Sequence, residues 1–233
     1  MRTYGQFCPV AKAAELFCER WTALIIRDLA LGATRFSELQ RGVPLASPTI
    51  LSRRLAQLEA EGGIARRRAA DAGRWTNHLT EAGRDFVPVV LALGTWGQRW
   101  SRRELAEHEV DLGLLLWAVE RSARAQALGA GRSIVELEFP EQPEHKRRWW
   151  FLNEAGRTEL CLEPPGDDVT LFLRVSLYDL ILIWRGDLTL DRALAEGRLE
   201  AHGKRAAVRA LPDWMGLSPL AHVGSQRRES TAA

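Results

Sequence analysis

The 233-residue sequence predicts an α+β protein built in two parts. Residues up to about 105 show the apolar spacing of helices, interrupted by one short paired segment. Residues 133–175 change to the two-residue alternation of strands, and helical spacing returns after them. We therefore expect an N-terminal winged helix-turn-helix domain, followed by a C-terminal antiparallel sheet covered by helices.

Two helices come before the capped, basic helix that completes a helix-turn-helix arrangement. Residues 20–32 have helical spacing, and Gly32 can supply the C-terminal cap. A second helix opens at residues 35–39, and the segment 42–45 leads out of it as a breaker. The apolar positions of the helix at 20–32 are Leu24, Ile25, Leu29 and Leu31.

The next helix has the character of one that enters a DNA major groove. Ser47 is a good N-cap, and Pro48 stands at the first helical position. The outward face is short, polar and basic near its start, as close approach to base edges requires. An ordinary amphipathic surface helix is the alternative, and Arg54, nearer the apolar side, can pair with a carboxylate instead. The residues expected to contact bases or nearby phosphates are Thr49, Ser52, Arg53 and Gln57.

A two-stranded hairpin with a basic tip follows this helix. Residues 64–68 form one strand, 69–73 a polar turn, and 74–80 the returning strand. This arrangement is a wing, and its cations would hold the DNA backbone or the minor groove. The cations are Arg66, Arg67, Arg68 and Arg74.

Five sequence blocks in this order and spacing resemble the HxlR-type winged-helix family of bacterial transcription regulators. The resemblance covers residues 4–100, and Gly62-Gly63-Ile64 departs from the single glycine usual in that family. It implies double-stranded DNA as a partner. The blocks are Cys8-Pro9-Val10, Arg20-Trp21-Thr22, Arg35-Phe36-Ser37-Glu38-Leu39, Ser47-Pro48-Thr49-Ile50-Leu51-Ser52-Arg53-Arg54-Leu55 and Leu79-Thr80-Glu81-Ala82-Gly83.

A helix over residues 86–100 carries a continuous apolar stripe that ends in Trp96 and Trp100. The resemblance implies a symmetric homodimer built from this helix and the N-terminal helix. Two copies related by a two-fold axis would contact two half-sites about one turn of DNA apart. The alternative is that both tryptophans pack on the second domain.

Cys8 precedes Pro9 at the start of the first helix, where the helix dipole would favour the thiolate. The matching cysteine is a redox sensor in some members of the resembling family. The alternative for Cys8 is a small residue packed at an interface. Cys18 and Cys161 are expected to be plain core residues.

The distribution of charge agrees with a DNA-binding N-terminal part. Residues 1–105 hold 16 Lys and Arg against 10 Asp and Glu, whereas residues 106–233 hold 16 against 20. The three cysteines and five histidines show no metal-ligand spacing, and no catalytic motif or cofactor motif occurs. Without a leader or a membrane-spanning stretch, we expect a cytoplasmic protein.

The second part begins after a mostly helical segment at 101–131. Strand patterns occur at 135–139, 149–152, 159–163 and 169–175, separated by turn residues. Helical patterns at 177–184, 188–195 and 206–211 could cover one face of the resulting sheet.

This half resembles the sterol-carrier-protein-type lipid-binding fold over residues 133–223. The resemblance rests mainly on Leu177-Tyr178-Asp179-Leu180, Trp184-Arg185-Gly186-Asp187-Leu188, Ala193-Leu194-Ala195-Glu196-Gly197-Arg198-Leu199-Glu200, Gly203 and Leu211-Pro212-Asp213-Trp214-Met215. It implies an apolar cavity for a small apolar ligand, although the same side chains can be plain core. The candidate lining residues are Trp150, Phe151, Leu171, Leu173, Tyr178, Ile181 and Trp214.

The sequence thus predicts a dimeric DNA-binding transcription regulator, not an enzyme, that a small apolar ligand controls. A lipid carrier whose winged helix serves as a dimerisation scaffold is the alternative, and an enzyme acting in the C-terminal cavity stays open. The expected parts are a DNA-binding and dimerisation domain (1–105), a helical bridge (106–132), a ligand-binding domain (133–223) and a disordered tail (224–233).

Overall fold

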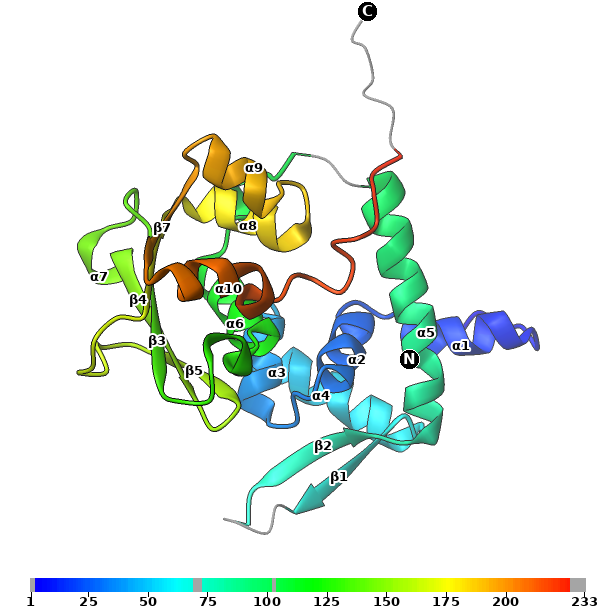
Figure 1. Ribbon diagram of the computed structural model, residues 1–233. Helices are drawn as coiled ribbons and strands as arrows, with labels where there is room; N and C mark the ends of the chain where they lie inside the picture. Colours follow the sequence, from blue (N-terminus) through cyan, green and yellow to red (C-terminus); the bar gives the residue numbers. More distant parts are fainter. Residues whose placement is uncertain (1–2, 69–72, 102–103, 227–233) are drawn as a thin grey trace, which may run out of the picture. The chain divides into compact units, whose positions relative to one another are not determined.

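The computed structural model describes residues 3–68, 73–101 and 104–226. The tip of the predicted wing turn, Arg102 and Arg103, and most of the predicted tail lie outside the described residues. The chain divides into two compact units, residues 1–97 and 98–233 (Figure 1). Both helices and strands occur, which confirms the predicted α+β class.

Four helices open the first unit: α1 (Pro9–Phe17), α2 (Thr22–Ala30), α3 (Phe36–Gly42) and α4 (Pro48–Ala60). In α2, Ile25, Ile26 and Leu29 are buried, while Leu24 and Leu31 are 37% and 53% exposed. Of the four apolar positions named from the sequence, only Ile25 and Leu29 are therefore buried. Leu31 lies beyond the last helical residue, and Leu24 is turned about 100° away from Ile25, on the side opposite Ile26.

Both ends of α4 are capped by residues of the sequence around it. The Ser47 hydroxyl accepts a hydrogen bond from the Ile50 backbone N–H at 3.3 Å, and Pro48 follows at the first helical position. At the other end, Gly62 adopts a left-handed conformation and the Gly63 N–H donates to the Leu58 carbonyl at 2.8 Å. This is the Schellman arrangement, and it explains the glycine at position 62.

A hairpin of β1 (Ile64–Arg68) and β2 (Trp75–Leu79) extends away from the helices as the predicted wing (Figure 1). The middle of β2 is fixed to the loop between α2 and α3. The backbone N–H and the side-chain Nδ2 of Asn77 both donate to the Thr34 carbonyl, at 2.8 and 3.1 Å. Because Asn77 is buried, these bonds exchange little with water.

The longest helix, α5 (Glu81–Trp96), begins at a Thr80 cap and continues into a π-helical turn (η1, Gly97–Ser101). Its first turn passes very close to the end of α4. A Cβ atom at Gly83 would lie 2.0 Å from the Gly63 carbonyl oxygen, so only glycine fits there.

The second unit contains a five-stranded sheet in the order β5-β4-β3-β6-β7. The strands are β3 (Ser133–Glu138), β4 (Arg148–Glu154), β5 (Arg157–Cys161), β6 (Leu171–Val175) and β7 (Leu199–Gly203). The sheet is mixed, because β3 and β6 run parallel while the other neighbours are antiparallel. The prediction of a purely antiparallel sheet is therefore wrong, and β7 was not expected as a strand.

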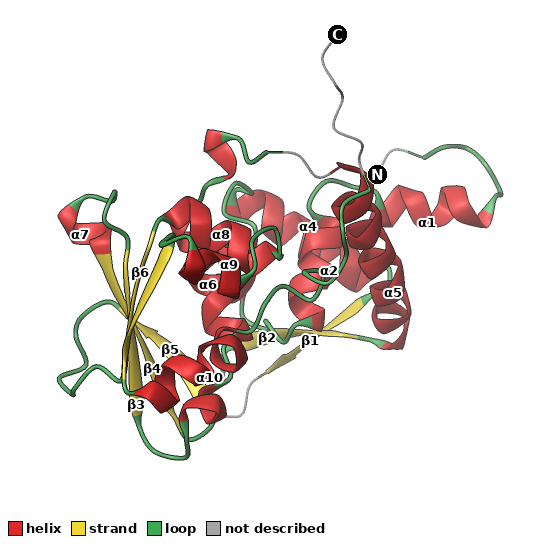
Figure 2. Cartoon of the chain, turned by 45° about the horizontal axis from the view of Figure 1, so that its top comes forward, coloured by secondary structure: helices red, strands yellow, loops and turns green. Residues whose placement is uncertain are grey.

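Helices α6 (Leu112–Ser122), α8 (Leu177–Arg185) and α10 (Arg205–Met215) pack on one face of this sheet (Figure 2). Shorter helices are α7 (Glu144–Arg147) and α9 (Leu190–Ala195), with 3-10 turns at η2 (Glu107–Glu109) and η3 (Ala125–Leu128). Inside the core, the amide of buried Asn153 accepts hydrogen bonds from Trp214 Nε1 (2.8 Å) and Thr158 Oγ1 (2.7 Å). A polar group thus joins β4, β5 and α10 within an apolar core.

Candidate nucleic-acid interface

The outward face of α4 is open to solvent. Thr49, Ser52 and Arg53 are exposed, whereas Leu51, Leu55 and Leu58 are buried beneath them. The exposed side chains lie within about two turns of the helix start, and all can donate hydrogen bonds. Short hydroxyls and one long cation on the same face can approach the base edges and phosphates of a duplex.

Arg54 has a different role from Arg53, because it is buried and fully engaged within the unit. Its Nη2 lies 2.5 Å from the Glu19 carboxylate, and its Nε donates to the Arg20 carbonyl at 3.2 Å. Its Nη1 donates to Gln57 Oε1 at 2.6 Å. The pairing of Arg54 with a carboxylate, one alternative from the sequence, is confirmed. Half-buried Gln57 keeps its amide nitrogen as the donor for any contact with DNA.

The wing arginines are exposed and divide between the two faces of the hairpin. From the strand register, Arg66 and Arg68 share a face with Trp75, while Arg67 shares the other with Thr76 and His78. The Arg66 guanidinium lies over the Trp75 ring, 5.0 Å from its centre. Arg74, the fourth predicted cation, is exposed just before β2.

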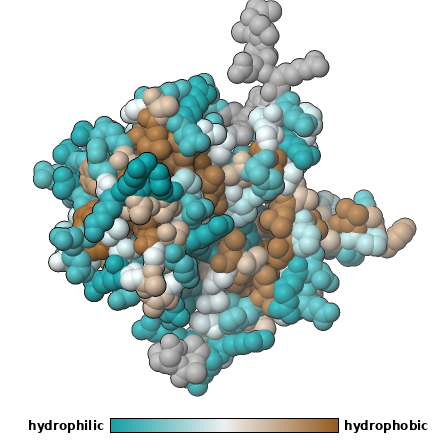
Figure 3. Space-filling view, viewed as in Figure 1, coloured by the Kyte–Doolittle hydropathy of each residue, from teal (hydrophilic) through white to brown (hydrophobic). Residues whose placement is uncertain are grey.

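A second feature of this unit is an apolar surface along α5. Val89, Leu91, Leu93 and Trp96 are exposed, and apolar side chains gather over this helix (Figure 3). The N-terminal segment also exposes apolar side chains, at Tyr4, Phe7 and Val10. The two surfaces are joined by Phe17 of α1 and Phe86 of α5, whose rings stack with centroids 3.6 Å apart. Large exposed apolar patches mark interaction sites.

The three cysteines are free and lie in different surroundings. Cys8 is half-buried at the N-cap position of α1, without a side-chain capping bond. Cys18 is exposed, so its prediction as a core residue is wrong: α1 ends at Phe17, and the apolar helical face does not extend to Cys18. Cys161 is half-buried, and burial raises the pKa of its thiol.

The residues predicted to line a C-terminal cavity do not all lie together. Phe151, Leu171, Leu173, Ile181 and Trp214 are buried in one apolar cluster between the sheet and its helices. Trp150 lies on the opposite face of β4 from Phe151 and is half-buried. Tyr178, on α8, is exposed.

A capped helix with an exposed polar and basic face, beside a hairpin with exposed arginines, defines a winged helix-turn-helix protein of the DNA-binding transcription-regulator class. The family described as HxlR-like helix-turn-helix matches residues 16–105. Together with the relatives below, this match shows that the chain belongs to the HxlR-like helix-turn-helix family. The family is one of transcription regulators and not of enzymes.

Among the relatives, the HTH-type transcriptional regulator YvaP of Bacillus subtilis (strain 168) is 34% identical over 98 residues, covering 41% of this chain and 91% of YvaP. An HTH-type regulator of Mycobacterium tuberculosis (strain ATCC 25618 / H37Rv) is 41% identical over 96 residues, which are 40% of this chain and 60% of that protein. The structure of redox regulator HypR in its oxidized form is 29% identical, with a TM-score of 0.39, and the match covers 42% of this chain and all of that one.

None of the helices in the described part of the chain is both long enough and apolar enough to cross a membrane.

Proposed function

We propose that this chain regulates transcription by binding double-stranded DNA as a homodimer, with α4 in the major groove. Thr49, Ser52 and Arg53 would contact base edges or nearby phosphates, with Gln57 at the rim of the contact. Arg66, Arg67, Arg68 and Arg74 would hold the sugar-phosphate backbone from the wing. The observation that carries the proposal is the solvent-exposed polar face of α4 beside the buried Arg54 anchor.

Dimerisation through α5 and the N-terminal segment is the second part of this proposal. It is supported by Leu93 and Trp96, which are both 59% exposed, and by the neighbouring apolar side chains at the N-terminus. One helix contacts only a few base pairs, so two copies are needed for a half-site pair about 34–36 Å apart. Replacing Leu93 and Trp96 together by serine should convert a dimer into a monomer in analytical ultracentrifugation.

DNA binding is tested by fluorescence anisotropy on a duplex selected from a random pool, compared with unselected DNA at several salt concentrations. If Arg53 contacts a guanine through two hydrogen bonds, Arg53→Ala should lose about 1–3 kcal/mol on the selected duplex and little on the unselected one. Arg68→Ala should weaken both duplexes alike and flatten the salt dependence. Arg209→Ala removes an exposed cation of α10 and serves as the matched control.

An equal loss on both duplexes would remove Arg53 from the base-contacting residues. Absence of affinity for either duplex at low salt would overturn the proposal in favour of the carrier alternative, in which the winged helix serves only for dimerisation.

We further propose that a small apolar ligand in the C-terminal unit controls DNA binding. The support is the large apolar cluster between the sheet and its helices, which includes Phe151 and Trp214. A ligand can shift DNA affinity only if it binds one arrangement of the dimer better than another. Mass spectrometry of the purified protein would detect a retained lipid, and DNA affinity unchanged by its removal would contradict the proposal.

A further inference from the structure

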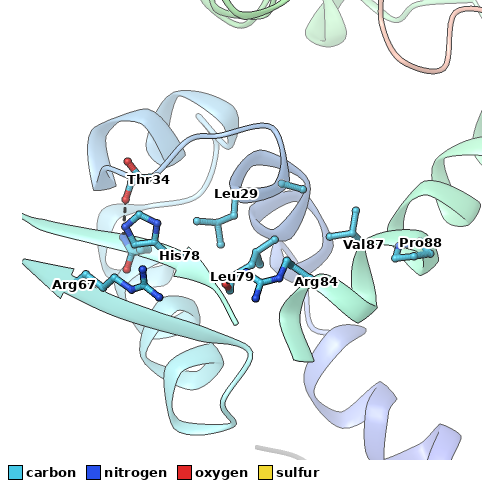
Figure 4. Close-up of a pocket in the computed structure, with 10 residues that line it drawn as sticks. Leu29, Thr34, Arg67, His78, Leu79, Arg84, Val87 and Pro88 are labelled. Atoms are coloured by element: carbon cyan, nitrogen blue, oxygen red, sulfur yellow. Dashed lines mark hydrogen bonds between the residues drawn. The ribbon is translucent and has the colours of Figure 1, made fainter. Parts of the chain in front are cut away.

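The first unit contains a pocket of about 550 Å³ between α2, the wing and the start of α5 (Figure 4). Its volume falls in the range of sites that hold small molecules. Its residues come from α2, both strands of the wing, α5 and the loop after α2. They are Leu29, Ala30, Thr34, Arg67, Asn77, His78, Leu79, Arg84, Val87 and Pro88.

The pocket has two guanidinium groups and no carboxylate in its lining. Arg67 enters from β1 and Arg84 from α5, so that their side chains approach the same space from opposite sides (Figure 4). Arg84 Nη1 donates to the Leu79 carbonyl at 2.9 Å, and among the described residues neither guanidinium pairs with an acidic side chain. Two neighbouring cations without a counter-charge favour an anion.

The rest of the lining is polar at one end and apolar at the other. Asn77 and Thr34 are already bonded to each other, and His78 Nε2 lies 2.9 Å from Thr76 Oγ1. The apolar wall consists of Leu29, Leu79, Val87 and Pro88 (Figure 4). An inorganic anion would use the arginines but leave this wall exposed to water, whereas an apolar group attached to the anion would cover it.

We infer that this pocket binds a small organic monoanion with a compact apolar body, of the class of aromatic or branched aliphatic carboxylates. The carboxylate accepts hydrogen bonds from Arg67 and Arg84, and the apolar body packs on Leu79, Val87 and Pro88. A carboxylate matches the planar donor fork of a guanidinium, which explains arginine at both positions.

Occupancy of the pocket has a consequence for DNA binding. Arg67 is also one of the wing cations assigned to the DNA backbone, so a carboxylate that holds Arg67 competes with a phosphate. The ligand should therefore lower the affinity for DNA. This consequence rests on the proposed function, whereas binding of the anion by the free protein does not.

Calorimetric titration of the full chain, without DNA, tests the site with four probes: benzoate, cyclohexanecarboxylate, benzyl alcohol and inorganic phosphate. Both carboxylates should bind saturably, and benzyl alcohol and phosphate at least about tenfold more weakly, as expected when a charge-assisted bond or the apolar contact is lost. Arg84→Gln and Arg67→Gln should each weaken benzoate binding by about 10- to 100-fold. Arg209→Gln, the control in the other unit, should leave it unchanged.

Three results would overturn the inference. Phosphate that binds as tightly as benzoate would mean that the site contacts only DNA phosphates. The other two are a benzoate affinity that neither pocket variant changes, and carboxylate binding that does not saturate. Arg84 is exposed, so Arg84→Gln should unfold at the same temperature as the unmodified protein. An unchanged unfolding temperature excludes misfolding as the cause of weaker benzoate binding.

A second measurement separates this inference from the proposed function. Saturating benzoate should reduce the DNA affinity of the unmodified protein, and Arg84→Gln should bind DNA normally but lose this response. Benzoate binding without any DNA binding would sustain the pocket and overturn the proposed function. Normal DNA binding that benzoate leaves unchanged would overturn the competition at Arg67.

Discussion

The guanidinium of Arg54 meets the carboxylate of Glu19 at 2.5 Å, although the two residues are 35 positions apart. This ion pair fastens α4 to the segment between α1 and α2. Its neighbour Arg53 is turned by about 100° and is exposed. Of two consecutive arginines, one therefore holds the helix in place and the other is open to solvent.

Removing the Glu19 side chain should destabilise the first unit. Arg54 is only 7% exposed, so Glu19→Ala leaves a buried cation without its counter-charge, and because the Glu19 side chain is itself 33% exposed the loss should be about 1–3 kcal/mol in urea unfolding. Replacing both partners, with Arg54→Met added, should recover part of this loss because no buried charge remains. Arg53→Met is the control and should stay within about 0.5 kcal/mol. A cost below about 1 kcal/mol for Glu19→Ala would show that the pair contributes little.

Gly83→Ala should destabilise the protein even though alanine is the better helix former. A Cβ at this position would meet the Gly63 carbonyl oxygen at 2.0 Å, and overpacking of this kind costs about 1–3 kcal/mol or more. Gly97→Ala is the matched control, because its backbone is helical and no atom lies within 4 Å of its added Cβ. Gly97→Ala should be neutral or stabilising by up to about 1 kcal/mol. Thermal unfolding measures both, and equal effects would contradict the close approach of α5 to Gly63.

Asn153→Ala should weaken the second unit by leaving the buried indole N–H of Trp214 without its acceptor. An unsatisfied buried donor costs about 1–3 kcal/mol. Phenylalanine has no N–H to leave unpaired. Trp214→Phe should therefore lower the free energy of unfolding less in the Asn153→Ala background than in the unmodified protein. Additive losses in this double-mutant cycle, measured by chemical unfolding, would mean that the hydrogen bond contributes nothing.

The cysteines should differ in their rate of alkylation by iodoacetamide in the folded protein. Cys18 is exposed, whereas Cys161 is half-buried and burial raises the pKa of its thiol, so less thiolate is present at neutral pH. Peptide mass spectrometry at pH 7.5 should find Cys18 modified well before Cys161, and the difference should narrow as the pH is raised. Modification of Cys161 first would contradict the packing of β5.

Acid should release the N-terminal segment from α1. The backbone N–H of Tyr4 and the hydroxyl of Thr3 each donate to the Glu15 carboxylate at 2.8 Å and lower the pKa of Glu15 below 4.5. A lowered pKa means that this stabilisation is complete above the ordinary value and is lost as the pH falls through the lowered one. The protection factor of the Tyr4 amide in hydrogen exchange, which corrects for the intrinsic pH dependence of exchange, should therefore rise as the pH is raised through the pKa of Glu15. Glu15→Gln should abolish this pH-dependent rise.

The helices of the first unit could be predicted because local residues determine them. Ser47 and Pro48 fix the start of α4, and the pair of Gly62 and Gly63 fixes its end. The parallel pairing of β3 and β6 could not be predicted, because alternation reveals a strand but not its neighbour. Strand β7 could not be predicted because it lies at the edge of the sheet, where Glu200 and His202 are exposed and the apolar alternation typical of a strand is weak.

The pocket in the first unit also had no sequence signature. Arg84 is one charged residue in the first turn of a helix, an ordinary place for a solvated side chain. Its significance comes from Arg67, 17 positions earlier on a strand, and from the apolar side chains of α2 and α5. Only the packing of three elements against one another brings these groups to the same space.

The double hydrogen bond from Asn77 to Thr34 joins the middle of β2 to the loop that precedes α3. The hairpin therefore cannot swing freely while α3 and α4 stay still. The distance between α4 and the wing is then set by the protein itself. If both elements contact DNA as proposed, a duplex has to present a groove and a row of phosphates at that fixed distance to bind both at once.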